Sequence, residues 1–310
     1  MNIVTLTVNP SIDKSTTVVD IIPEHKLRCS SPIFQPGGGG INVSRAIKKI
    51  GGESLAVYLA GGATGQKLTE LINEEGVETK VVNQENRTRE NFIVVDHTGA
   101  QYRFGMPGTS VKKQECDNLV HILDSLPKKP EYLVLSGSLQ DDVPADFYSQ
   151  IAVEAKKHGV KVILDTVGKA LVETLRTGVF MIKPNLQELF DLAGFKEILP
   201  GKYVEIARKL IEEQKTEVVV ISMGGKGAAL VTKDEHYTVV PPATQCKSTV
   251  GAGDSMVGGI VLSLSRNEGF KKALELGVAT GTAATMNEGT SLCKKEDVDQ
   301  IMSYFSSANS

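Results

Sequence analysis

Short runs of β-branched and other apolar residues alternate along the chain with segments of helical periodicity. Between the runs, apolar residues recur every three or four positions, as at Val43, Ala46, Ile47 and Ile50, which is typical of amphipathic helices. Continuously apolar strands that alternate with such helices predict an α/β fold, with a mostly parallel sheet covered by helices on both faces. The runs that predict buried strands are Ile3–Val8, Leu55–Ala60, Tyr132–Ser136, Val160–Asp165, Phe180–Lys183 and Val218–Ser222.

Two stretches interrupt this alternation. Thr16–Ile22 and Lys26–Phe34 are predicted as strands with no helix between them, and Asn91–His97 with Gln101–Met106 as a hairpin that turns at residues 98–100. We interpret residues 14–34 and 88–107 as a small β-sheet lid inserted into one domain spanning residues 1–310. A sheet this small cannot bury both faces alone, so we expect it to pack against a second copy in a homodimer.

Composition and charge exclude several classes of protein. The 310 residues are 41% hydrophobic and 23% charged, with a net charge of −3 and no block of like charge, which argues against nucleic acid or an anionic membrane as the partner. No apolar run approaches the roughly 20 residues that span a bilayer, and no signal peptide is recognised. The four cysteines form no CxxC pair, and the five histidines form no cluster with ligand spacing. We therefore expect a cytoplasmic protein with reduced thiols.

The segment Ser248–Ser255, STVGAGDS, carries the strongest chemical signal. Its glycines precede an apolar helical face, so backbone N–H groups and the helix dipole there favour a phosphoryl group. Asp254, in the first turn, is placed to accept a proton from a substrate hydroxyl. The alternative is that Asp254 merely caps the helix and that the two glycines serve packing.

Three further segments fit a ligand site, and each has a purely structural alternative. Pro36–Asn42, PGGGGIN, brings backbone close to a ligand, or else forms a flexible loop. Lys183–Glu188, KPNLQE, offers an amide and a carboxylate suited to a hydrated Mg²⁺, or else a capping box. Ser222–Gly227, SMGGKG, offers backbone amides to nucleotide phosphates, or else is a tight turn between two strands.

Together these motifs resemble the ribokinase-like, PfkB-type carbohydrate kinases over essentially the whole chain. The resemblance implies a three-layer α/β/α kinase that uses ATP and Mg²⁺ on a sugar phosphate. The residues that carry it include TLTVNPSID, PGGGGINVSRAIKKIGG, LSGSL, KPNLQE, SMGGKG and TVGAGDSMVGG. The GxGxxG of a NAD-dependent dehydrogenase is not found after the first predicted strand, and a non-catalytic regulator would lack the base or the anion hole.

The resemblance also implies a role for each matching residue. Asp254 would be the catalytic base, and Gly251, Ala252 and Gly253 would form the anion hole. The sugar phosphate would contact Asp13, Lys26, Gly38, Gly39, Asn42, Arg89 and Ser138. ATP would contact Lys183, Asn185, Ser222, Gly224, Gly227, Thr249 and Asn287, and Glu188 would organise Mg²⁺ through water. A K⁺ site would form from Ser248, Val250, Ala284, Asn287, Gly289 and Ser291.

Two features bear on the substrate. Arg89, and less directly Arg87 and Arg103, could meet a phosphate already present on the sugar, although each could instead be a solvated surface charge. Gly39 stands where tagatose-6-phosphate and 1-phosphofructokinase relatives often carry lysine. This favours the 6-phosphofructokinase branch of the family, hence fructose 6-phosphate, with the other two activities as alternatives.

Overall fold

The computed structural model describes residues 1–197, 199, 201–213 and 215–308. The strands of this part are Ile3–Thr7 (β1), Ser11–Thr17 (β2), Ile33–Gly37 (β3), Leu55–Ala60 (β4), Glu78–Asn83 (β5), Arg89–Val95 (β6), Gln101–Phe104 (β7), Tyr132–Ser136 (β8), Lys161–Asp165 (β9), Val179–Ile182 (β10), Thr216–Ser222 (β11), Ala228–Val231 (β12) and His236–Val239 (β13). The six predicted core strands are therefore confirmed to within one or two residues at each end.

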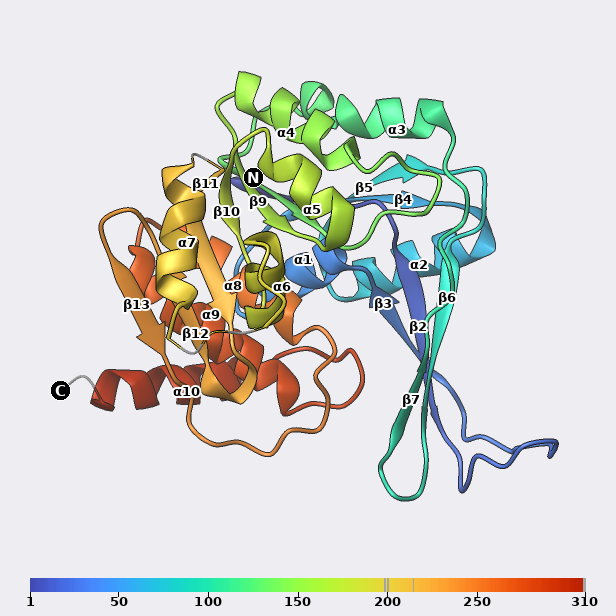
Figure 1. Ribbon diagram of the computed structural model, residues 1–310. Coiled ribbons are helices and arrows are strands. Elements are labelled where there is room, and N and C mark those ends of the chain that lie inside the picture. Colours follow the sequence, from blue (N-terminus) through green and yellow to red (C-terminus); the bar gives the residue numbers. More distant parts are fainter. Residues whose placement is uncertain (198, 200, 214, 309–310) are drawn as a thin grey trace.

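The helices alternate with the strands through most of the chain (Figure 1). They are Gly39–Lys49 (α1), Gly62–Glu74 (α2), Lys113–Val120 (α3), Phe147–Lys157 (α4), Gly168–Leu175 (α5), Leu186–Leu192 (α6), Tyr203–Glu212 (α7), Ala252–Ser265 (α8), Phe270–Thr285 (α9) and Lys295–Ala308 (α10), with short 3₁₀ turns at Ile122–Ser125 (η1) and Gly224–Lys226 (η2).

The main sheet has the strand order β13-β12-β11-β10-β9-β8-β1-β4-β5. Each strand from β11 to β5 in this order pairs in parallel with its neighbour. At the other edge, β12 pairs antiparallel with β11, and β13 pairs antiparallel with β12. One core cluster joins one face of the sheet to α3–α7, and a second joins the other face to α1 and α8–α10. The predicted three-layer α/β/α architecture is confirmed.

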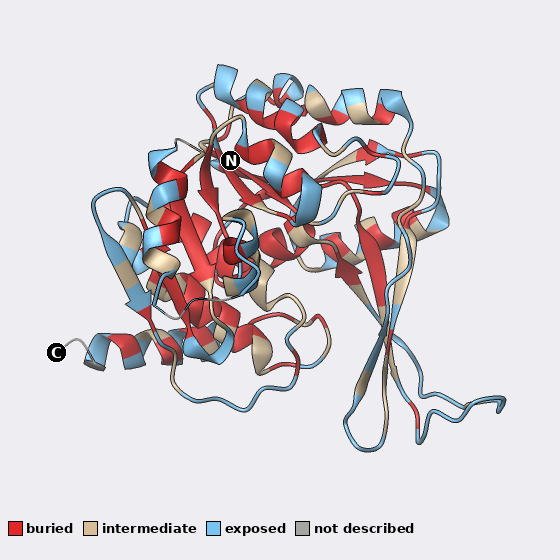
Figure 2. Cartoon of the chain, in the orientation of Figure 1, coloured by how far each residue is buried: buried red, intermediate tan, exposed pale blue. Residues whose placement is uncertain are grey.

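A second sheet of four strands, in the order β3-β2-β6-β7, stands at one side of the body (Figure 1). The predicted hairpin is confirmed as the antiparallel pair β6 and β7, whose turn is closed by a hydrogen bond from Asp96 N to Ala100 O. Much of this sheet is exposed, whereas the central strands of the main sheet are buried (Figure 2).

The predicted strands Thr16–Ile22 and Lys26–Phe34 are wrong in their bounds. The pairing segments are β2, Ser11–Thr17, and β3, Ile33–Gly37, while residues 18–32 form an excursion that carries no strand. Val19, Ile21 and Ile22 gave the strand-like pattern but are exposed. A β-branched run predicts a strand only where its side chains are buried against a sheet, and here they are not.

No helix among the described residues is long and apolar enough to cross a bilayer.

Candidate active site

The predicted site residues Ser138 and Lys183 lie at the carboxyl ends of parallel strands, together with Asn9 and Asp165, which were not predicted. Asn9 follows β1, Ser138 follows β8, Asp165 ends β9 and Lys183 follows β10. In a parallel sheet these ends meet at one edge, where open α/β folds bind their ligands. The fold therefore gathers residues that are as much as 174 positions apart, from Asn9 to Lys183.

The catalytic candidate Asp254 lies half-buried in the first turn of α8. The helix is capped by Gly251, in the left-handed region at φ 72°, without a side-chain cap hydrogen bond. Asp254 is therefore not the N-cap, and that alternative is wrong. Its Oδ2 accepts a hydrogen bond of 2.9 Å from Asn42 Nδ2, which brings α1 and α8 together at this carboxylate.

The pKa of Asp254 is raised to about 7. Burial is the main cause, because the charged carboxylate loses its water, and the nearby carboxylate of Asp165 adds to it. The Asn42 hydrogen bond, Lys183 and Arg45 act in the opposite direction. A carboxyl group with a pKa near neutrality is suited to general-base work at physiological pH.

Lys183 lies beside this carboxyl group. Its Nζ is 3.2 Å from Asp165 Oδ1, in a buried ion pair, and is close enough to the start of α8 that a Cβ added to Gly253 would lie 3.3 Å from it. Burial lowers the pKa of Lys183, but Asp165, Asp254 and Glu188 outweigh it, so the pKa is raised and the ammonium stays charged. Asp165 was missed at the sequence level, although an acid at the end of a predicted buried strand signals a site.

The predicted sugar-binding glycines begin α1 and do not form a flexible loop. A Cβ on Gly39 would lie 2.3 Å from Ser136 Oγ and 2.8 Å from Gly137 N, so only glycine lets this backbone approach the end of β8. Asn42 follows in the next turn. The glycines thus position the start of α1 against the sheet.

Asp13 lies buried on β2 of the small sheet. Its Oδ1 accepts hydrogen bonds of 2.9 Å from Ser11 Oγ and from Asn91 Nδ2 on β6. A Cβ on Gly37 would lie 2.7 Å from its Oδ2, so this strand approaches the carboxylate closely. Asn91 was not predicted as part of the site.

Arg89 is half-buried where β6 meets the main sheet. Its Nη1 donates to Met106 O at 2.8 Å and its Nη2 to Asn9 O at 3.1 Å, while Nε is buried without a hydrogen-bond partner among the described residues. Burial lowers the pKa of Arg89, and Asp13 opposes this. Arg89 is therefore not a solvated surface charge, and its unpaired N–H remains for an anion.

The remaining predicted sugar contacts and lid arginines differ in their surroundings. Ser138 Oγ accepts a 3.3 Å hydrogen bond from Asn9 Nδ2, so both lie at the edge of the main sheet where the carboxyl ends of the parallel strands meet. Lys26 lies in the exposed segment of residues 18–32, and no hydrogen bond or ion pair joins it to this site within the described ranges. Arg103 contacts Thr249 Oγ1 at 3.5 Å, which joins the hairpin to the loop before α8. Arg87 is exposed.

The predicted nucleotide segments lie next to each other. A β-bridge joins Asn185 to Ser222, and Ser222 N donates to Pro184 O. Asn185 and Glu188 form the capping box of α6, with reciprocal bonds of 2.9 and 2.8 Å. The structural alternative, a capping box, is therefore found in the fold. The capping bond uses only Oε2 of Glu188, so Oε1 has no part in the cap.

Gly224 and Gly227 form the turn between β11 and β12, and both have positive φ. Met223 N donates to Gly227 O, so the tight-turn alternative is present too. Asn287 is buried at the end of α9, and its Nδ2 donates to Ala283 O at 3.0 Å.

The residues predicted for a K⁺ site come from two segments that the fold brings together. Ser248 Oγ donates to Gly289 O at 3.1 Å, and Val250 N donates to Ser248 Oγ at 3.2 Å. Gln35 on β3 donates to Ser291 Oγ at 3.0 Å. Oxygen atoms of hydroxyl and carbonyl groups are suitable ligands for a hard cation. The K⁺ site, with Ala284 and Asn287 as further ligands, stays a prediction.

Comparisons with known proteins show the family of this chain. The pattern of the pfkB family carbohydrate kinases matches residues 7–297. The chain belongs to the pfkB family. The ATP-dependent 6-phosphofructokinase isozyme 2 of Escherichia coli (strain K12) is 41% identical over 308 residues, which cover 99% of each chain. The 1-phosphofructokinase of Bacillus subtilis (strain 168) is 33% identical over 300 residues, 97% of each.

Solved structures of the pfkB family superpose closely on this chain. The phosphofructokinase-2 from Escherichia coli in complex with substrates and products has a TM-score of 0.94 at 40% identity, covering 99% of this chain and 100% of that one. The same protein in complex with potassium has a TM-score of 0.94 at 40% identity, and its tetrameric inhibited form has a TM-score of 0.93 at 39% identity. Both matches cover 98% of this chain and 99% of the other chain. Ribokinase from Giardia lamblia shares the fold, with a TM-score of 0.77 at 17% identity over 98% and 100% of the two chains.

Proposed function

We propose that this pfkB-family kinase transfers the γ-phosphoryl group of ATP to the free primary hydroxyl of fructose 6-phosphate, which yields fructose 1,6-bisphosphate as in glycolysis. The observation that carries the proposal is the half-buried Asp254 carboxyl, bonded to Asn42, with its pKa raised to about 7, at the start of a helix and beside Lys183. A base, a fixed cation and a helix N-terminus at one place are the elements that phosphoryl transfer requires.

In this mechanism Asp254 accepts the proton of the hydroxyl as its oxygen attacks phosphorus. The backbone amides of Gly251, Ala252 and Gly253 bind the transferring group, because the helix N-terminus favours negative charge there. Lys183, held by Asp165, neutralises phosphate charge. The small sheet closes over the site and excludes water, which would otherwise compete as the acceptor.

ATP is held by the neighbouring segments at the ends of β10 and β11. Glu188, with one carboxylate oxygen outside the capping box, is suited to hold Mg²⁺ through water, and bound Mg²⁺ neutralises charge on the transferring phosphates. Thr249, Ser222, Gly224, Gly227 and Asn287 complete the proposed nucleotide contacts. The oxygen set around Ser248 and Gly289 is proposed to bind K⁺, as potassium is bound in a solved relative.

The acceptor is proposed to be a phosphorylated sugar because of Arg89. Its guanidinium is anchored by two carbonyl groups and keeps a buried, unpaired Nε–H, and a planar guanidinium suits a phosphate group. Asp13, Gly38, Gly39 and Asn42 are proposed to contact the sugar hydroxyls, with Ser138 and Lys26 near the same substrate. Gly39, at the position where tagatose-6-phosphate and 1-phosphofructokinase relatives often carry lysine, favours fructose 6-phosphate over the alternatives.

The proposed biological unit is a cytoplasmic homodimer of one-domain chains, paired through the lid of residues 14–34 and 88–107. Phe34, Phe92 and Phe104 lie in register across that sheet and are exposed. An apolar row on a small sheet favours pairing with a second copy.

Turnover efficiency on a panel of sugar phosphates tests the substrate. We expect kcat/KM on fructose 6-phosphate to exceed that on tagatose 6-phosphate, on fructose 1-phosphate and on free fructose, in a coupled assay of ADP release. A higher value on tagatose 6-phosphate or fructose 1-phosphate would assign one of the alternative activities, and a higher value on free fructose would remove the role given to Arg89.

A further inference from the structure

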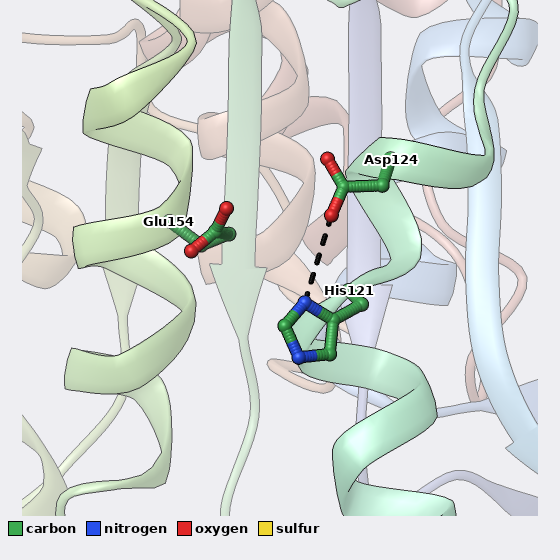
Figure 3. A group of neighbouring side chains, drawn as sticks. All are labelled: His121, Asp124 and Glu154. Carbon is green, nitrogen blue, oxygen red and sulfur yellow. Dashed lines mark ion pairs between the residues drawn. The ribbon is translucent and has the colours of Figure 1, made fainter.

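A group of metal-ligating side chains lies outside the active site, where α3 and η1 meet α4. His121 ends α3, Asp124 lies in η1, and Glu154 projects toward them from α4 (Figure 3). One ligand atom of each lies within 4.8 Å of the others. His158, one turn after Glu154, contacts Asp124 and Glu154 but is not one of the three side chains whose ligand atoms all lie within 4.8 Å of one another.

The spacing of the ligand atoms suits a tetrahedral transition-metal ion. His121 Nδ1 is 3.6 Å from Asp124 Oδ2, and His158 Nε2 is 3.0 Å from Asp124 Oδ1 and 3.7 Å from Glu154 Oε1. Bonds of about 2.0–2.1 Å to such an ion place neighbouring ligand atoms about 3.4 Å apart. The spacings within the group of His121, Asp124 and Glu154 are compatible with that value after side-chain rotation, and the imidazole–carboxylate set selects a zinc-type ion over Mg²⁺.

The group lies at the opposite edge of the main sheet from the catalytic residues. The η1 turn precedes β8, and the end of α4 precedes β9, so both lie at the amino ends of parallel strands. Asp165 and Ser138 lie at the carboxyl ends of the same strands. An ion held here would join two helices of one layer without contacting the kinase site.

We propose that His121, Asp124 and Glu154, with His158 bonded to Asp124 beside them, form a divalent transition-metal site that is independent of the kinase reaction. The sequence gives no sign of it, because Asp124 and Glu154 are 30 residues apart and the histidines lack motif spacing. Bound metal would stabilise the folded chain, since the unfolded chain does not hold these ligands together.

Co²⁺ is the probe that tests the site on the metal-stripped full chain. We expect about one equivalent by calorimetry, a visible d–d spectrum without a thiolate band, and a higher thermal midpoint. His121→Gln and Asp124→Asn should each weaken binding at least tenfold, while His236→Gln, at an exposed histidine of β13, should not. Absence of saturable binding, unchanged affinity in both variants, or a thiolate band from Cys29 or Cys246 would overturn the proposal.

A second, independent observation concerns Arg45, and the inference from it rests on the proposed role of Asp254. Arg45 is buried on α1, with 1% of its side chain exposed. Its Nε and Nη2 donate to the carboxylate of Glu75 at 3.0 and 2.6 Å, and its Nη1 donates to Asn42 Oδ1 at 3.1 Å. Asn42 in turn donates from Nδ2 to Asp254.

This chain of bonds fixes the orientation of the Asn42 amide. Arginine only donates hydrogen bonds, so the amide oxygen must face Arg45 and the amide NH₂ must face Asp254. Glu75 holds the guanidinium in place with two bonds. We infer that Arg45 is a positioning residue for the catalytic base, acting through Asn42.

The Arg45→Met/Glu75→Leu double variant tests this without leaving a buried charge unpaired. We expect kcat to fall roughly tenfold or more, and the acid limb of the kcat/KM profile to move to higher pH. The pKa of Asp254 should rise because the variant removes the positive charge of Arg45 and frees the Asn42 amide from the orientation in which it donates to Asp254. Asp165 and Lys183 stay in place. Lys67→Met/Glu70→Leu, which removes an exposed ion pair on α2, is the matched control and should leave the limb in place.

The outcomes separate the inference from the proposed function. If Asp254→Asn abolishes turnover but the folded double variant keeps the acid limb of the wild type, the role of Arg45 is wrong and that of Asp254 stands. If Asp254→Asn retains turnover, the base itself is misassigned and the inference fails with it.

Discussion

At the scale of single residues, the site depends on charges held out of water. Asp254, Asp165 and Lys183 are brought together at the edge of the sheet, and Arg45 lies behind them. Each carboxylate alone would be costly to bury, and each is balanced by a cation or an N–H donor. As a consequence, we expect the folded state to lose stability as the pH rises and Asp254 ionises.

Replacing Asp254 should therefore stabilise the protein above neutral pH. The pKa of Asp254 is raised from 3.8 to about 7 in the fold, so its favourable contribution is complete below about 4 and is lost as pH rises through 7. Asp254→Asn has no such loss. We expect its thermal midpoint to exceed that of the wild type by a few degrees at pH 8 and the difference to vanish near pH 4.

Thermal scans across this pH range check the sign directly. Asp191→Asn, at an exposed carboxylate of α6, is the matched control and should show no such crossover. A variant of Asp254 that is less stable than the wild type at pH 8 would mean that the carboxylate is held by more bonds than the structure contains.

At the scale of elements, glycine at the start of α1 lets two elements touch. We expect Gly39→Ala to lower both the thermal midpoint and kcat, because the added Cβ would lie 2.3 Å from Ser136 Oγ and 2.8 Å from the backbone of Gly137. Displacing this helix start also moves Asn42. Gly105→Ala, where a Cβ meets no atom within 4 Å, is the control. Equal midpoints for the two variants would show that the approach is not tight.

The secondary-structure elements show which parts of the fold could be predicted from the sequence. Apolar runs such as Leu55–Ala60 were placed correctly because burial on both faces leaves a continuous pattern. Residues 19–22 were misplaced because the exposed β-branched side chains of Val19, Ile21 and Ile22 imitate a buried strand. Motif residues such as Asn42 and Lys183 were predicted together. Arg45 and Asp165 were missed because their partners Glu75 and Lys183 lie on other elements, and spacing along the chain does not reveal such contacts.

At the scale of the whole molecule, the small sheet carries apolar surface that the chain itself does not cover. Phe34 and Phe92 flank Lys14 in register, with the ammonium 5.3 and 5.5 Å from the ring centroids, and Phe104 continues the row. Because the solved relative includes a tetrameric form, assembly is a property to measure on this chain.

We expect Phe92→Asp to shift the protein toward monomer and to reduce turnover. A charge in the middle of the apolar row opposes its burial against a second copy. Light scattering after gel filtration measures the mass, and Val153→Asp, at an exposed apolar position of α4, controls for the added charge. An unchanged mass for Phe92→Asp would place the interface elsewhere.

The most direct test of the account is the pH dependence of kcat/KM with fructose 6-phosphate and saturating Mg-ATP. Asp254 must be deprotonated to accept the hydroxyl proton, so we predict that the wild-type rate falls about tenfold per pH unit below about 7. We also predict that folded Asp254→Asn loses about 10²–10⁴-fold in kcat. A rate that stays level down to pH 5, or near-normal turnover by Asp254→Asn, would contradict the assignment of Asp254 as the base.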